Sequence, residues 1–176
     1  HLNYARAFEC YKQAAELGNT EALVAMGTCY STGDGAPAKD YARAFECYKQ
    51  AAELGNTEAL VAMGDCYWTG NGVPAQDSAQ AFKCYNQAAD LGNTHAFVQI
   101  GNCYWEGHGV PQNESKAFVH WKVAMVLKND LGAFKVAECL TLGRGTEENR
   151  EEARTILLDL ISRDVPDAAS FYAANF

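Results

Sequence analysis

The chain has 176 residues, of which 48% are hydrophobic and 20% are charged, a composition typical of a folded globular protein rather than a disordered one. No apolar run approaches the roughly 20 residues that a membrane-spanning helix requires. The formal net charge of −8 at pH 7 argues against a nucleic-acid-binding protein, because phosphate binding needs a basic surface, and it favours a basic or mixed-charge partner.

One segment of 24 residues occurs twice with identical sequence. YARAFECYKQAAELGNTEALVAMG spans residues 4–27 and again 41–64, and a diverged copy, AQAFKCYNQAADLGNTHAFVQIG, follows at 79–101. Landmark residues recur every 37 positions: Gly27, Gly64 and Gly101; Pro37, Pro74 and Pro111; and Ala22, Ala59, Ala96 and Ala133. A period of this length predicts an array of stacked repeat units.

Within one unit the apolar residues follow helical spacing, and the segments between them carry turn and cap signals. In the short turn LGNT, Gly55 suits the left-handed residue that ends a helix, and Asn56 or Thr57 suits the start of the next helix. The longer connection TGNGVPAQD contains glycines and a proline, and Asp77 is placed to cap the helix that follows. The unit is therefore predicted to be a pair of antiparallel helices.

The pattern predicts a single all-α array over residues 1–176. The expected helices are 4–17, 20–31, 40–54, 57–69, 77–91, 94–105, 114–128, 131–142 and 148–163, with a partial helix at 167–174. The expected units are a partial unit 1–18, repeats at about 19–55, 56–92, 93–129 and 130–164, and a partial C-terminal helix 165–176. An isolated pair buries too little apolar surface to fold, so we expect the units to stabilise one another by stacking. Because the array begins and ends within a repeat, we expect the chain to be either an excerpt of a longer array or a chain with atypical end caps.

The stretch AFECYKQAAELGNTEALVAMGDCYWTGNGVPAQD resembles the Sel-one-like repeat, a branch of the tetratricopeptide-like helical repeats. The shared landmarks are the glycine of the short turn, the following alanine, a Gly-x-x-Tyr segment and Gly-x-Gly-Val-Pro. The resemblance implies an α–α superhelix, a right-handed solenoid of antiparallel helix pairs with a concave face. It also implies a non-enzymatic scaffold or adaptor, because such repeats commonly hold other proteins together.

By the same resemblance, the second helix of each pair lines the concave face and binds a protein or peptide segment. The partner-binding residues implied in this way are Glu58, Val61, Asp65, Trp68, His95, Val98, Asn102, Trp105, Glu106 and Lys135, with Glu21, Val24, Thr28 and Ser31 in the first copy. Trp68 and Trp105 are either exposed binding residues or braces for the glycine-rich loop. The carboxylates beside them favour a partner that carries Lys or Arg, although single surface carboxylates are commonly only solvated.

Six of the seven cysteines alternate at spacings of 19 and 18 residues, so that each unit has one on each helix: Cys10, Cys29, Cys47, Cys66, Cys84 and Cys103. The secreted, cysteine-rich branch of the family bridges positions about eight apart across the short turn, and those positions here hold residues such as Ala52 and Leu60. We therefore predict reduced thiols in buried core positions, with Cys139 making the count odd. Reduced thiols favour a reducing compartment and a cytoplasmic protein.

No cofactor, metal site or catalytic constellation is predicted. The histidines are scattered, no C-x-x-C is present, and His120 is expected to replace the Cys84-type core residue. The Gly-x-Gly tripeptides repeat with the fold and follow no strand, so they are not a nucleotide-binding signature. Two alternatives stay open: a secreted repeat protein with a weak hydrolase or a peptidoglycan- or sugar-binding role, and a purely structural or engineered repeat segment. The sequence does not predict the oligomeric state.

Overall fold

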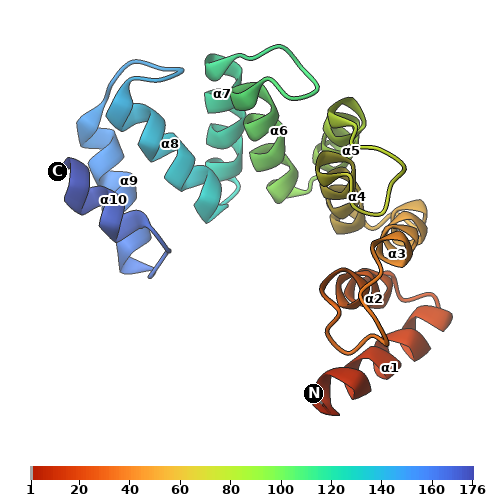
Figure 1. The fold of residues 1–176 in the computed structure, drawn as a ribbon. Coiled ribbons are helices and arrows are strands. Elements are labelled where there is room, and N and C mark those ends of the chain that lie inside the picture. The colour runs from red at the N-terminus through yellow and green to blue at the C-terminus, as the bar shows by residue number, and fades with distance from the viewer. Residues whose placement is uncertain (1) are drawn as a thin grey trace. The chain divides into compact units, whose positions relative to one another are not determined.

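The computed structural model describes residues 2–176, and this part of the chain folds into ten helices with no strand (Figure 1). The helices are α1 (Leu2–Glu16), α2 (Thr20–Thr32), α3 (Tyr41–Glu53), α4 (Thr57–Thr69), α5 (Ser78–Asp90), α6 (Thr94–Glu106), α7 (Glu114–Val126), α8 (Asp130–Leu142), α9 (Arg150–Ser162) and α10 (Ala168–Asn175). The predicted all-helical organisation is confirmed, and the predicted helix ends agree with the observed ones to within one or two residues.

The helices form two compact units, unit 1 (His1–Asn93) and unit 2 (Thr94–Phe176). Within each unit every helix packs against the next one along the chain, from α1 to α5 in unit 1 and from α6 to α10 in unit 2. Figure 1 draws unit 1 in red to olive and unit 2 in green to blue. In the described residues no helix has both the length and the apolar character that crossing a membrane requires.

The predicted cap residues form the caps. The side chain of Asn56 accepts a hydrogen bond from the Ala59 amide at 3.0 Å, and Asp77 accepts one from the Gln80 amide at 2.9 Å. Gly55 has φ of +89°, the left-handed conformation expected after a helix C-terminus. These local contacts explain why the helices begin and end at the same place in successive repeats.

The landmark glycine of the second helix makes room for an aromatic ring of the next repeat. A Cβ atom on Gly64 would lie 2.4 Å from Tyr85 Cε1, and a Cβ atom on Gly101 would lie 2.3 Å from Trp121 Nε1. Gly27 stands in the same relation to the ring of Tyr48. The 37-residue period of glycine is therefore a packing requirement, because each ring lies directly on a helix backbone.

The repeat before α8 is one residue shorter than a strict period. Asn56 and Asn93 are 37 positions apart, but Asn93 and Asn129 are only 36 apart, because the loop before α7 lacks one residue. Asn129 accepts a hydrogen bond from the amide of Gly132, as Asn56 does from Ala59. The expectation that Ala133 continues the alanine series is therefore wrong, and Gly132 occupies that position.

The cysteines mostly occupy the core, as expected, and each of the seven is free. Five are buried: Cys47, Cys66, Cys84, Cys103 and Cys139. Cys29 is half-buried, and Cys10 is exposed, contrary to the prediction. The reason is packing: α3, which carries Cys47, packs extensively on both α2 and α4, whereas α1 packs extensively only on α2.

Candidate functional site

Unit 1 contains a pocket of about 770 Å³ formed mainly by α1 and α2. Its lining residues are Asn3, Tyr4, Ala7, Tyr11, Glu21, Val24, Ala25, Thr28, Cys29, Thr32, Asp34 and Glu58. Three of them are carboxylates and none is Lys, Arg or His. Tyr4 and Tyr11 expose 60% and 37% of their surface. The unit 1 pocket therefore combines aromatic walls with uncompensated negative charge.

Unit 2 contains a smaller pocket, of about 290 Å³, with a different charge pattern. Its lining residues are Asn102, Trp105, Glu106, Trp121, Lys135, Glu138, Cys139, Leu142 and Arg144. Lys135 Nζ lies 2.8 Å from Glu138 Oε2, and Arg144 is paired with Glu114 at the start of α7. The charges of the unit 2 pocket are therefore largely neutralised within the unit.

At the two predicted tryptophans the glycine-rich loop is held by the backbone carbonyl, a contact that does not involve the ring. Gln112 Nε2 donates to the Trp105 carbonyl at 2.8 Å, and Gln76 Nε2 donates to the Trp68 carbonyl at 2.6 Å. The half-buried ring of Trp105 lies 5.2 Å from the ring of Trp121, and the Arg144 guanidinium lies 4.1 Å from its centre. Trp105 therefore lines the unit 2 pocket with its ring in contact with Arg144 and Trp121.

The structure brings together some of the predicted partner-binding residues. Glu58 lines the unit 1 pocket, and the unit 2 pocket includes Asn102, Trp105, Glu106 and Lys135. These five residues therefore lie on pocket surfaces of their own units.

The prediction that Val61 and Val98 contact a partner is wrong, because both side chains are buried. Val61 is 5% exposed and Val98 is fully buried, so both belong to the core. Val98 packs in the cluster that contains Trp121, and its carbonyl accepts a hydrogen bond from Trp121 Nε1 at 3.2 Å. A groove that joins residues of both units stays a prediction.

Two further predicted residues are exposed but already engage neighbouring side chains. Asp65 accepts a hydrogen bond from the Tyr85 hydroxyl at 2.8 Å. The His95 ring nitrogen Nε2 lies 3.5 Å from Gln99 Nε2, one helical turn away. Neither residue is among those that line the unit 1 or unit 2 pocket.

Sequence reasoning missed the middle residue of the Gly-x-Gly loops. Asp34 lines the unit 1 pocket and Arg144 lines the unit 2 pocket, each from this loop position. The loop folds back because Gly35 and Gly145 have positive φ and approach the first helix of their own repeat too closely for a Cβ atom. A signal was present in the sequence, since the middle residue is polar in every copy: Asp34, Asn71, His108 and Arg144.

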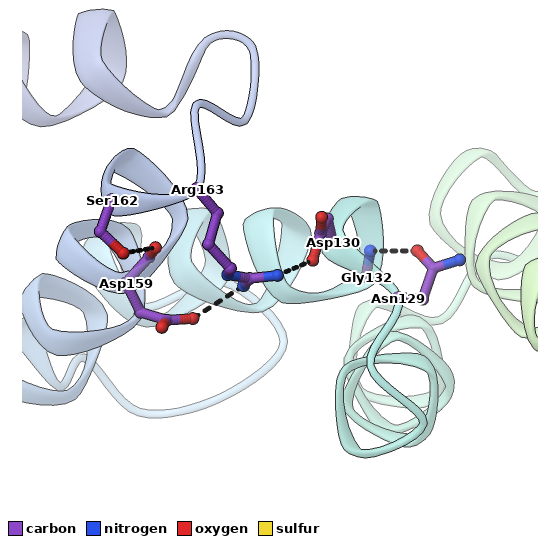
Figure 2. Close-up of polar contacts among 6 residues, drawn as sticks. All are labelled: Asn129, Asp130, Gly132, Asp159, Ser162 and Arg163. Atoms are coloured by element: carbon purple, nitrogen blue, oxygen red, sulfur yellow. Dashed lines mark hydrogen bonds and ion pairs between the residues drawn. The ribbon is translucent and has the colours of Figure 1, made fainter.

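A third pocket, of about 440 Å³, lies in unit 2 beside the start of α8 and the end of α9. Figure 2 shows its polar contacts, in which Arg163 reaches both Asp130 and Asp159, the latter at 2.7 Å. Asn129 caps α8 next to this cluster through the amide of Gly132. Because its charges pair with one another, the cluster mainly links α8 to α9.

The cysteine of the unit 2 pocket is not poised for nucleophilic chemistry. Burial, and next the charge of Glu138, raises the pKa of Cys139 to about 11. The same effect of burial raises the pKa of Cys103 to about 12. Both thiols are therefore protonated at neutral pH. Among residues 2–176, no group of three or more His, Cys, Asp or Glu side chains is arranged to hold a metal ion.

Comparison with known structures relates the chain to bacterial repeat proteins. A protective antigen of uropathogenic Escherichia coli that displays an SLR fold matches with a TM-score of 0.77 and 29% identity, over 91% of this chain and 34% of that protein. A Sel1 repeat protein from Oxalobacter formigenes matches with a TM-score of 0.85 and 24% identity, over 96% of this chain and 66% of that protein. Helicobacter pylori cysteine rich protein B matches with a TM-score of 0.59 and 20% identity, over 78% of this chain and 98% of that protein.

A search among curated proteins found no match. The chain spans about a third of the Escherichia coli antigen, so it corresponds to part of that protein's length. The family model of the Sel1 repeat matches residues 2–19, 20–56, 57–93, 98–124 and 130–156. With helical hairpins, recurring caps and the glycine–aromatic contacts of the repeat in place, the chain belongs to the Sel1 repeat family.

Proposed function

We propose that this chain is a non-enzymatic protein–protein interaction scaffold that binds a basic segment of a partner protein. Sel1 repeats commonly serve as interaction scaffolds, and that is the coarse function of the family. The observation that carries the finer proposal is the unit 1 pocket, in which three carboxylates and two tyrosines gather without a basic residue. Such a pocket suits a cationic side chain.

The chemistry of the unit 1 pocket favours Lys or Arg flanked by small apolar residues. A guanidinium or ammonium group gains from charge-assisted hydrogen bonds to Glu21, Asp34 and Glu58. The exposed rings of Tyr4 and Tyr11 offer apolar contact and a cation–π partner. The unit 2 pocket is a second, weaker contact region, because Lys135 is paired with its carboxylate Glu138 and Arg144 adds a further positive charge to its lining.

Selection from a random peptide library displayed on phage tests this proposal. We expect peptides enriched in Lys and Arg, with binding that weakens as salt concentration rises. The variant Glu21→Gln/Asp34→Asn/Glu58→Gln keeps the side-chain shapes and removes the charges. It should bind the selected peptides at least about tenfold more weakly in isothermal titration.

The matched control removes the same number of exposed carboxylates from unit 2: Glu147→Gln/Glu148→Gln/Glu151→Gln. This control should bind as the unmodified chain does, with equal helicity by circular dichroism. Equal weakening in both variants would show that only net charge matters, and unchanged binding in the pocket variant would overturn the proposal.

Cellular location is part of the same proposal. Seven free cysteines support a reducing compartment such as the cytoplasm, and they do not support the disulfide-bonded alternative. Thiol titration of the protein from its native source, denatured without reductant, should yield seven reactive groups. A lower count would favour the secreted alternative.

A further inference from the structure

Three leucines at the short turns of unit 1 are left in solvent. Leu17, Leu54 and Leu91 expose 89%, 61% and 62% of their surface. They occupy the same position of successive repeats, immediately before the left-handed glycine of each turn. We call these three residues the leucine row.

The fold places the leucine row on adjacent turns of one edge. Leu54 and Leu91 have nearly identical backbone angles, with φ of −88° and −90° and ψ of 8° in both. Asn56 Nδ2 donates to Thr20 Oγ1 of the preceding turn at 3.2 Å. Asn93 Nδ2 likewise donates to Thr57 Oγ1 at 3.3 Å. Neighbouring turns are therefore tied together by direct side-chain hydrogen bonds.

The leucine side chains contribute little to the fold, because most of their surface stays in water. A single exposed leucine is ordinary in a soluble protein, but three on adjacent turns form a repeated apolar surface. The leucine also persists where the repeat has diverged: Glu46 and Lys49 of the second copy become Lys83 and Asn86 in the third. Leu54 is matched by Leu91 across the same change.

The charge beside the leucine row is negative. An acidic residue directly precedes each leucine: Glu16, Glu53 and Asp90. The turn segments 13–21, 50–58 and 87–93 contain no Lys or Arg. A ligand that covers the row must therefore offer apolar groups together with positive charge.

We propose that the leucine row docks an amphipathic helix of another protein that presents aliphatic side chains beside Lys or Arg. Successive turns are neighbours, because Asn56 reaches Thr20 and Asn93 reaches Thr57 directly. As a trial spacing for the aliphatic residues of the partner helix we take one heptad, a rise of about 10.5 Å. A second copy of this chain would bring the same carboxylates, and an anionic membrane would be repelled by them. The surface is additional to the proposed function, because no residue of the row lines the unit 1 pocket.

A fluorescein-labelled model peptide tests the inference by fluorescence anisotropy. The peptide has about 21 residues, Leu at every seventh position, Lys on both sides of each Leu, and Ala and Gln elsewhere. The variant Leu17→Gln/Leu54→Gln/Leu91→Gln should bind it at least about tenfold more weakly than the unmodified chain. The matched control replaces three exposed apolar residues of unit 2 that line neither the unit 1 nor the unit 2 pocket, Val119→Gln/Val126→Gln/Leu158→Gln, and should bind as the unmodified chain does.

Further arms of the experiment separate the alternatives. Binding of the peptide to the Glu21→Gln/Asp34→Asn/Glu58→Gln variant should persist. If only that variant lost binding, the peptide would occupy the unit 1 pocket, and the leucine row would be excluded while the proposed function stood.

Four other results would overturn the inference. The first two are that the row variant and the unmodified chain bind the peptide equally, and that neither of them binds it. The third is that the unmodified chain binds a peptide with Glu in place of Lys equally well. The fourth is that the leucine row binds phosphatidylglycerol vesicles or a second copy of this chain instead of the peptide. Unchanged circular dichroism melting of the row variant would show that lost binding is not lost fold.

Discussion

The pockets of unit 1 and unit 2 are lined from equivalent positions of the repeat, but they differ in charge. In both, the second helix of a pair and the middle residue of a Gly-x-Gly loop supply lining residues. Asp34 adds negative charge to the unit 1 pocket, whereas Arg144 adds positive charge to the unit 2 pocket and lies against Trp105. The second helix and the glycines of the loop therefore place lining residues at equivalent positions in both units. The residue between the two glycines contributes much of the difference in pocket charge.

The inter-repeat aromatic contacts differ in the same way. Tyr85 of unit 1 packs on Gly64 and donates its hydroxyl to Asp65, so that this carboxylate is engaged. Trp121 of unit 2 packs on Gly101 but donates to the backbone carbonyl of Val98. A change of ring thus alters which group of the preceding helix accepts the hydrogen bond of the ring, while the packing contact is kept.

Truncation of Trp121 or Tyr85 should give the largest loss of stability. Comparing the two losses shows whether the contact of Trp121 with Gly101 and that of Tyr85 with Gly64 are equivalent. Trp121→Ala should lower the free energy of unfolding by about 3–5 kcal/mol, because Trp121 is nearly fully buried and its hydrogen bond is lost as well. Tyr85→Ala should cost less, since its ring is smaller. Urea unfolding followed by circular dichroism measures both losses. Val119→Ala, at an exposed position, is the control, and an equal loss there would contradict the assignment.

Substitution of the landmark glycines should give the next largest effect. Gly64→Ala and Gly101→Ala should each destabilise by about 1–3 kcal/mol through overpacking against Tyr85 or Trp121. The gain in helix propensity, about 1 kcal/mol, offsets part of this. Gly55→Ala separates the causes, because its Cβ atom would meet nothing within 4 Å and only its positive φ is strained. A stabilising effect of Gly101→Ala would disprove the close contact.

The histidine that replaces a buried cysteine should make stability depend on pH in unit 2. His120 stacks on Tyr104 at 5.5 Å and on Phe97 at 6.4 Å, and its Nδ1 is buried without a hydrogen-bond partner. Burial, and then the nearby Lys116, lowers the pKa of His120 below its ordinary 6.5. Below about pH 6.5 the unfolded chain therefore binds more protons than the folded one, and stability falls as the pH falls.

The variant His120→Cys restores the residue found at Cys84 and should remove this pH dependence. The slope between pH 7 and pH 5 should decrease by at most about 1.4 kcal/mol per pH unit, the value for one proton. Thermal melts across this range measure it. The exposed His95→Gln is the control, and an unchanged slope in His120→Cys would contradict the burial argument.

A change of charge in the Gly-x-Gly loop of unit 2 should have the smallest effect, and the quantity that it changes is peptide affinity. Arg144→Asn gives the unit 2 loop the residue found at Asn71 and frees Glu114 and Trp105 from the guanidinium. We expect basic peptides to bind about two- to threefold more tightly, because the unit 2 pocket then resembles the unit 1 pocket. Titration with the peptides selected on the unmodified chain measures the change. Weaker binding would show that Arg144 itself contacts the partner.

The helices could be predicted from sequence because each boundary is encoded locally. The expected helix 57–69 coincides with α4, whose start depends on Asn56 and whose end depends on Gly70. The assignment of Ala133 to the alanine series is wrong because a fixed count of 37 residues ignores the shortened loop. The cap residue Asn129 marks the true register of this repeat. Local signals were thus reliable where fixed counting failed.

The pockets could be predicted only in part, because lining a pocket depends on neighbouring elements. Val61 and Val98 lie on the predicted helices, but the helix that packs next buries them. Asp34 and Arg144 reach the pockets only because their loops fold back over a helix. Neither fact follows from the residue's own repeat pattern.

The hydrogen bonds from Asn56 to Thr20 and from Asn93 to Thr57 have a consequence for engineering. A duplicate of residues 57–93 inserted after Asn93 would form the same inter-repeat contacts that the chain already contains, with Tyr85 packed on Gly64 in the new module as in the old. Lengthening unit 1 by whole modules should therefore require no new interface, and each module would add one more leucine to the exposed edge.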